Sequence, residues 1–132
     1  MSTRIGEVVE TSSTQFTTQC YRLYEAPPLG SLLRAGVERP VYGVVADVAT
    51  RSMDASRHPM PRGEFEESEE DVYLANPQLG RLLVTDVRCI VTGYQDTDGG
   101  IHRYIAPLPA RVYSFVYLCS HDEIMELSLI HI

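Results

Sequence analysis

The stretch that decides the fold opens the chain with Ile5-Gly6-Glu7-Val8-Val9-Glu10, followed after a Ser/Thr-rich turn by Gln15-Phe16-Thr17-Thr18-Gln19-Cys20-Tyr21. Two further short apolar segments lie at residues 29–35 and 41–50, and turn residues such as Gly36 and Pro40 separate them. Short strands divided by turns are typical of small β-barrels and sandwiches. We therefore expect an all-β fold, a small closed or partly open antiparallel β-barrel of about six or seven strands.

The later strands follow from alternation. In residues 84–94, Val87, Cys89 and Val91 fall on one face of the expected strand. Asp98-Gly99-Gly100 is typical of a hairpin turn, after which residues 101–106 return antiparallel. The last strand, 111–119, carries apolar side chains on both faces, so we expect it to be central or to cover a subunit contact. The nearly continuous apolar run 41–50 predicts a strand that is buried on both faces or lies on a barrel wall.

A short helical insert is expected between the fourth and fifth strands, at about residues 68–83. Ser68 and Asp71 have the capping-box spacing, and Asn76-Pro77 is typical of a second helix start. Leu79, Leu82 and Leu83 have the spacing of an inward-facing helical stripe, so we expect this insert to plug one end of the barrel.

The insert follows an acidic run, because residues 64–71 hold six carboxylates among eight positions. The run lacks the spacing of a calcium-binding loop, so a cation site is disfavoured. A solvated helix start is the favoured interpretation. An acidic docking surface for a basic partner is the second alternative.

Composition sets limits on function. The 132 residues suit one domain, and the formal net charge of −7 argues against strong, direct nucleic-acid binding. All 11 basic residues are arginines, so a lysine Schiff base and a G-x-x-x-x-G-K-[ST] nucleotide loop are excluded from these residues. No apolar run could span a bilayer, and no signal region opens the chain, so we expect a cytoplasmic location and no membrane partner.

No catalytic, cofactor-binding or metal-binding residue is assigned. Cys20, Cys89 and Cys119 form no C-x-x-C pair, which favours reduced, buried thiols over a zinc site. His58, His102 and His121 are spread along the chain, and His102 falls on the hairpin arm opposite the Cys89 strand. A thiol enzyme built on Cys89 and His102 is therefore a remote third hypothesis.

Several short motifs resemble one known family. Ile5-Gly6-Glu7-Val8, Phe16 in the second strand, Gly30 at the third and Tyr42-Gly43-Val44-Val45 in the fourth resemble the HAS-barrel. The HAS-barrel is the small N-terminal barrel shared by HerA-type DNA-translocating ATPases and rotary ATP synthase subunits. The resemblance spans roughly residues 4–119, and the insert is similar to that of bacterial HAS-barrel proteins in which the barrel stands alone or precedes an ATPase domain.

This resemblance implies a non-catalytic barrel module for ring assembly and partner docking of a HerA-type ATPase in DNA repair or end processing. The implied partners are further copies of the chain, as a homo-hexamer, an ATPase domain in cis or in trans, and a NurA-type nuclease. The alternative is a stand-alone barrel adaptor that binds a protein, a small ligand or single-stranded nucleic acid.

Two sets of residues are singled out as structural or interface candidates. Gly6, Gly30 and Gly43 are expected to be structural glycines where the barrel bends sharply, as in the family. Tyr113, Phe115 and Tyr117 form an aromatic stripe at strand spacing. Barrel core or a barrel-to-barrel contact is the favoured interpretation of this stripe, and base stacking in the manner of an OB-fold is the alternative.

The end of the chain is expected to differ from the rest. We expect a HAS-barrel-like domain at residues 4–119 and the start of a following helix or domain at 120–126. Leu127-Ser128-Leu129-Ile130-His131-Ile132 resembles the translation of a sequencing-library transposon end. We therefore expect residues 127–132 to be non-native and the natural chain to continue beyond Glu126, and His131 receives no role.

Overall fold

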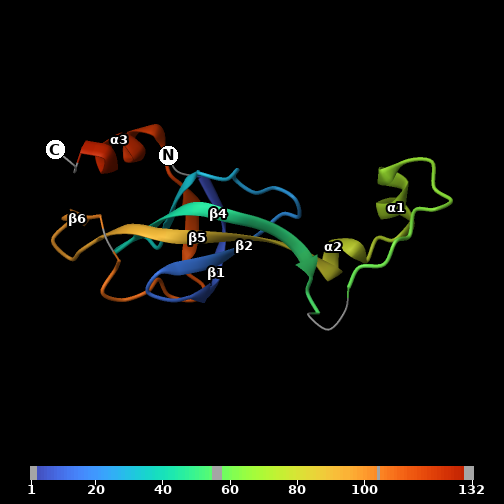
Figure 1. Cartoon of the computed structure of the whole chain (residues 1–132), viewed down its shortest axis with the longest axis horizontal. Coiled ribbons are helices and arrows are strands. Elements are labelled where there is room, and N and C mark those ends of the chain that lie inside the picture. Colours follow the sequence, from blue (N-terminus) through green and yellow to red (C-terminus); the bar gives the residue numbers. More distant parts are fainter. Residues whose placement is uncertain (1–2, 55–57, 104, 130–132) are drawn as a thin grey trace.

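The structure, a computed structural model, describes residues 3–54, 58–103 and 105–129, with side chains described as far as Met125. Seven antiparallel strands and three short helices occur within these residues (Figure 1). In chain order they are β1 (Thr3–Thr11), β2 (Gln15–Cys20), β3 (Leu32–Ala35), β4 (Val41–Ser52), α1 (Glu69–Ala75), α2 (Leu79–Leu82), β5 (Leu83–Gln95), β6 (Ile101–His102), β7 (Phe115–Leu118) and α3 (His121–Leu129).

Backbone pairing closes six of the strands into a ring. The order β2-β1-β7-β3-β4-β5 returns to its start because β2 also pairs with β5, for example Phe16 with Cys89. The short β6 pairs only with the far end of β5. This arrangement confirms the expected all-β, barrel-like fold of small size.

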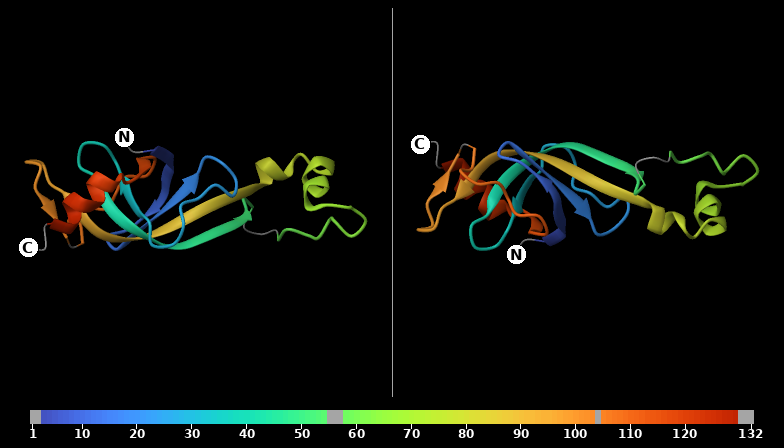
Figure 2. Two further views of the ribbon diagram at one scale, coloured as in Figure 1. Left: turned by 90° about the horizontal axis from the view of Figure 1, so that it is seen from above. Right: turned by 90° about the horizontal axis from the view of Figure 1, so that it is seen from below.

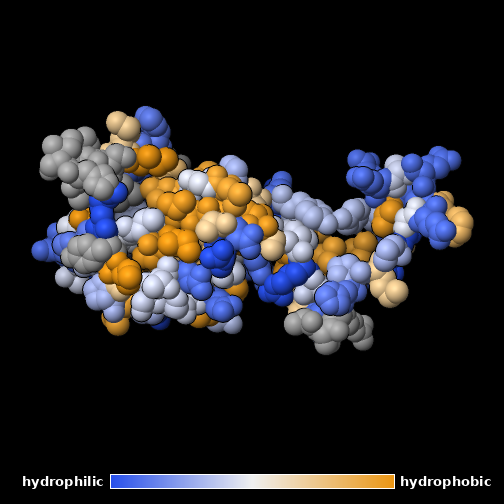
Figure 3. Space-filling view, in the orientation of Figure 1, coloured by the Kyte–Doolittle hydropathy of each residue, from blue (hydrophilic) through white to orange (hydrophobic). Residues whose placement is uncertain are grey.

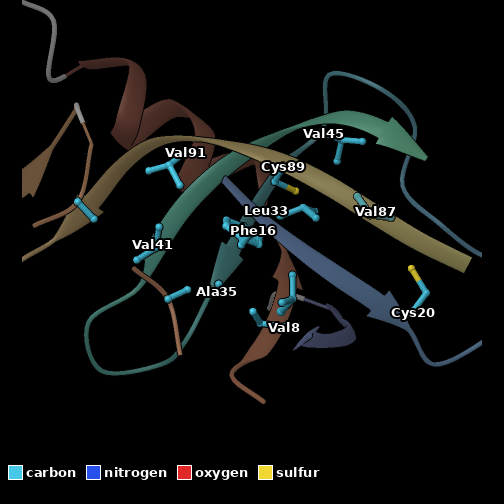
Figure 4. Packing of buried hydrophobic residues seen from close by; sticks show 13 residues of the cluster. Val8, Phe16, Cys20, Leu33, Ala35, Val41, Val45, Val87, Cys89 and Val91 are labelled. Atoms are coloured by element: carbon cyan, nitrogen blue, oxygen red, sulfur yellow. The ribbon is translucent and has the colours of Figure 1, made fainter. Parts of the chain in front are cut away.

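The core fills this ring with side chains from opposite walls (Figure 4). Phe16 lies at its centre, close to Leu33 and Cys89, and all three are fully or almost fully buried. Val87 and Val91 face the same interior as Cys89, as the alternation in β5 predicts. The last strand, β7, is central because it pairs with both β1 and β3.

A two-stranded arm extends from the barrel. The second half of β4 pairs with Leu83–Arg88 of β5. The pairing of β5 with β2 ends at Asp86, and beyond this point the two strands run away from the ring, a direction on which the three views agree (Figures 1 and 2). Residues 41–45 lie on the barrel wall between β3 and β5, which is one of the two predicted alternatives. Burial of the run ends at Val45, because residues 46–50 extend past the pairing with β3 and are exposed.

The helical insert lies at the end of the arm. Ser68 caps α1 as predicted, accepting a hydrogen bond from the backbone N–H of Asp71 at 3.2 Å. Asn76, however, caps the end of α1 through Tyr73, and α2 begins after Gln78. The expectation that the insert plugs the barrel is also wrong, since neither helix has a buried residue and both stand clear of the ring (Figure 1).

The C-terminal part differs from its predicted strand limits. Residues 101–106 form only the two-residue β6, with position 104 outside the described residues, because Pro107 and Pro109 follow closely and cannot donate to a ladder. The expected strand 111–119 shortens to β7. Tyr113 adopts a left-handed backbone conformation, with φ of 72°, which interrupts the extended chain before Phe115. A helix, α3, begins at His121 as expected.

Candidate interaction surfaces

The three cysteines are free, buried thiols. Cys20 and Cys89 belong to the barrel core, whereas Cys119 follows β7 and lies near Glu123 and Arg34. Burial raises the pKa of Cys20 to about 11, and it raises the pKa of Cys89 and of Cys119 to about 12. A thiol is nucleophilic only as the thiolate, so each of these groups is inert at neutral pH.

His102 is held away from Cys89. It lies on β6 opposite Tyr94, five residues along β5 from the cysteine, and its ring stacks on Tyr94 with centroids 4.9 Å apart. Its Nε2 lies 2.6 Å from Oδ2 of Asp96. Hydrogen bonds with Asp98 and His102 lower the pKa of Asp96 to about 2. The pair therefore fastens the hairpin turn and does not meet a nucleophilic thiol.

No group of three or more histidine, cysteine, aspartate or glutamate side chains is placed to hold a metal ion within residues 3–54, 58–103 and 105–129. In the same part of the chain, no helix has the length and apolar character needed to cross a membrane.

The three singled-out glycines lie at tight or unusual backbone positions. A Cβ on Gly6 would lie 2.2 Å from the carbonyl oxygen of Gln19, beside a register shift in the β1–β7 pairing. A Cβ on Gly43 would lie 2.8 Å from Cε1 of Phe16, beside a register shift between β4 and β5. Gly30 precedes β3 in a turn and has φ of 88°, so there the backbone conformation selects glycine.

The predicted aromatic stripe lies on the outside of the barrel. Phe115 is 40% exposed, Tyr117 is half-buried, and Val116 between them points into the core. Tyr113 is 74% exposed and lies in the turn before β7, so it extends the surface but not the strand. The stripe is therefore not barrel core.

Two arginines on neighbouring strands stack on this stripe. The guanidinium carbon of Arg4 on β1 lies 4.5 Å from the ring centroid of Phe115 and 5.9 Å from that of Tyr21. The guanidinium carbon of Arg34 on β3 lies 4.7 Å from the ring centroid of Tyr117. We call Arg4, Tyr21, Arg34, Tyr113, Phe115 and Tyr117 the aromatic–arginine strip.

Acidic side chains hold the edges of the strip. Glu123 of α3 accepts a hydrogen bond from Nη1 of Arg34 at 2.9 Å, which ties this helix to the outside of β3. Glu7 accepts a hydrogen bond from the Tyr21 hydroxyl at 2.7 Å. Sequence reasoning missed the two arginines of the strip and Tyr21. Cross-strand register brings Arg4 and Arg34 to Tyr117 on β7, and Tyr21 joins them through Arg4, so no local pattern reports the group.

Two clefts lie at opposite ends of the molecule. One, of about 630 Å³, lies between the β3–β4 turn and the proline loop, where Val37 and Leu108 are exposed beside Arg39 and Arg111. The other, of about 900 Å³, lies under the helical insert on the arm.

No protein-family description matches the chain, and no curated protein matches it.

Proposed function

We propose that this chain is a non-catalytic barrel module that packs side by side with copies of itself into a ring and docks a partner. By its resemblance to HAS-barrels, the ring is a hexamer that sits on a HerA-type DNA-translocating ATPase, supplied in cis or in trans, and receives a NurA-type nuclease during DNA end processing.

The aromatic–arginine strip is the observation that carries this proposal. Tyrosine, phenylalanine and arginine are enriched in protein interfaces, and tyrosine and arginine are frequent among the residues that contribute most of the binding energy. Here Tyr21 and Phe115 are exposed on one outer wall with Arg4 stacked against both rings, and Tyr113 is exposed in the turn before β7. A side wall that carries such groups suits lateral packing of barrels.

The reactive groups also favour a structural module over an enzyme. The thiols are buried and protonated, and His102 pairs with Asp96. The remote thiol-enzyme hypothesis has a direct test, since Cys89→Ser would abolish the activity of an enzyme that uses this nucleophile.

Native mass spectrometry of the chain across a concentration series tests the proposal. We expect a species of one closed copy number that dissociates in Phe115→Arg, because the new charge would be desolvated in the contact. Ile90→Arg is the matched control, since Ile90 is similarly exposed on β5, outside the strip. A chain that stays monomeric at every concentration contradicts ring assembly.

The alternative function is a stand-alone barrel that binds single-stranded nucleic acid, and the arginines beside Tyr117 and Phe115 favour it over other adaptor roles. It predicts binding that weakens with salt and with Tyr113→Ser or Tyr117→Ser. The net charge of −7 and the pairing of Arg34 with Glu123 argue against it.

A further inference from the structure

The arm is a second surface, at the opposite end of the molecule from the cleft beside the β3–β4 turn, and it carries an apolar cleft under the helical insert. The cleft of about 900 Å³ is lined on its apolar side by Met60, Val72, Leu79, Leu82 and Leu83. In a folded domain such a helical stripe normally packs against another element. Here no residue of α1 or α2 is buried.

Two further large apolar side chains of residues 58–82 are exposed to solvent. Phe65 is 91% exposed and Leu74 is 77% exposed, although both are large and apolar. Figure 3 shows such hydrophobic residues among strongly hydrophilic ones on the arm. Isolated exposed apolar side chains are common, but a cleft together with neighbouring exposed rings and branched chains marks an interaction site.

The negative charge of the insert indicates that its partner is basic. Residues 58–82 carry six carboxylates against two arginines, a formal charge of −4 with histidine neutral, which is more than half of the net charge of the chain. Five of these carboxylates are exposed, and Glu69 lines the cleft itself. Arg62, one of the two arginines, donates to the side chain of Asn76 at 3.2 Å.

The arm holds this surface in a fixed place. At its root, the Thr85 hydroxyl lies 2.8 Å from that of Thr50 and accepts a hydrogen bond from the backbone N–H of Tyr24 at 2.8 Å. Nearby, Arg51 donates to Asp86 at 2.8 Å. At its end, the rings of Tyr24 and Tyr73 meet edge to face with their hydroxyl oxygens 2.6 Å apart. Tyr24, in the loop after β2, thus fastens the insert to the barrel while the apolar stripe of the insert stays open.

We propose that the arm cleft is a docking site for a basic amphipathic segment of a partner protein, a helix with leucine-like side chains on one face and arginine or lysine along its flanks. The apolar face fills the cleft, and the basic flanks lie along the carboxylates of the acidic run. An amphipathic helix in a hydrophobic groove is a recurrent mode of recognition, with flanking charges fixing orientation. This inference does not depend on ring assembly, because it uses neither the strip nor a second copy.

A labelled synthetic helix of about five turns, with leucine at helical spacing and arginine elsewhere, is the probe. Binding to the intact chain is followed by fluorescence anisotropy and by backbone NMR shifts. We expect shifts confined to residues 58–83, and about fivefold weaker binding by Glu67→Gln/Glu70→Gln, because each exposed ion pair contributes a modest gain. The matched control is Glu10→Gln/Glu38→Gln, which changes the net charge equally on the barrel.

A second pair of variants tests the apolar part. Met60→Ser removes a cleft side chain that is 74% exposed, so the fold does not depend on it, and we expect weaker probe binding. Leu108→Ser, equally exposed at the opposite end, leaves binding unchanged. A probe with glutamine in place of arginine should bind at least fivefold more weakly. Equal loss from both acidic pairs, shifts spread over the barrel, or no binding would each overturn the proposal.

Discussion

Replacing Gly43 by alanine tests the packing of the barrel at its tightest side-chain contact. A Cβ at this position would lie 2.8 Å from Cε1 of Phe16, 2.9 Å from Cβ of Cys89 and 3.1 Å from the backbone oxygen of Ile90. Carbon atoms pack best at about 3.5–4.0 Å, so the new methyl group is close to 1 Å too near on two sides. Phe16 can turn, but Cys89 Cβ and the Ile90 carbonyl move only with β5.

The expected cost follows from these distances. Overpacking of this kind costs about 1–3 kcal/mol, and the fixed atoms of β5 place Gly43→Ala near the upper end. The smaller entropy of alanine in the unfolded chain returns about 0.4–1 kcal/mol. We therefore expect a net loss of about 2 kcal/mol, which for a domain of this size lowers Tm by about 8 °C.

Urea and thermal unfolding followed by far-ultraviolet circular dichroism give the measurement. Gly80→Ala is the matched control, since a Cβ there would meet nothing within 4 Å, and alanine in α2 should leave stability unchanged or raise it by up to about 1 kcal/mol. The double variant Gly43→Ala/Phe16→Leu should lose about 1 kcal/mol less free energy of unfolding than the sum of the losses in the two single variants. A free energy of unfolding for Gly43→Ala within about 0.5 kcal/mol of that of the parent chain would refute the predicted overpacking.

Four further predictions follow from the thiols, the hairpin and α3. Because Cys20, Cys89 and Cys119 are buried, a thiol reagent should modify them only at the rate of unfolding, as stopped-flow absorbance would record; rapid modification of the folded chain contradicts this burial. Since the folded pKa of Cys89 is raised to about 12 from 9.0, its contribution to stability is present below pH 9 and is lost as pH rises toward 12, measurable as a fall in urea midpoint. The folded pKa of Asp96 is lowered to about 2 from 3.8, so the contribution of this carboxylate to stability is present above pH 3.8 and is lost as pH falls toward 2. His102→Ala should raise this pKa, as a carboxyl NMR titration would record. An unchanged titration would show that His102 does not stabilise the carboxylate. Arg34→Ala removes both the Tyr117 stacking and the bond to Glu123, so hydrogen exchange in α3 should accelerate about tenfold, whereas exposed Arg111→Ala should leave it unchanged.

Most of the barrel follows from local sequence signals. The alternation of Val87, Cys89 and Val91 gives the buried face of β5, and Asp98-Gly99-Gly100 gives the hairpin turn that the structure has. Each of these signals is contained in a few consecutive residues, because strand pleating and turn geometry are local properties.

The arm could not be predicted from such local signals. Val48 and Thr50 continue the apolar and β-branched pattern of Val44 and Val45, yet they are exposed because β3 ends its pairing with β4 at Val44. How far a strand runs past its neighbour depends on the length of that neighbour. Leu79 and Leu82 have the spacing of a buried stripe, yet α2 has no buried residue. The sequence alone does not show whether another element packs against them.

The candidate surface was found only in part. Phe115 and Tyr117 were visible as alternate aromatic residues, but Tyr113 leaves the strand through its left-handed backbone. Arg4 and Arg34 join the strip through the register that pairs both of them with Tyr117, and β1, β3 and β7 are far apart in the sequence. A pairing between distant strands leaves no periodic mark in either one.

Hydroxyl-radical footprinting at low and high protein concentration tests whether copies of this chain pack through the aromatic–arginine strip. Tyr113 and Phe115 should be oxidised readily in the dilute chain and protected at concentrations where light scattering reports a larger mass. Phe65, 91% exposed on the arm, is the internal control and should be oxidised equally in both samples. Equal oxidation of Tyr113 and Phe115 at both concentrations, with or without a rise in mass, would contradict packing through the strip.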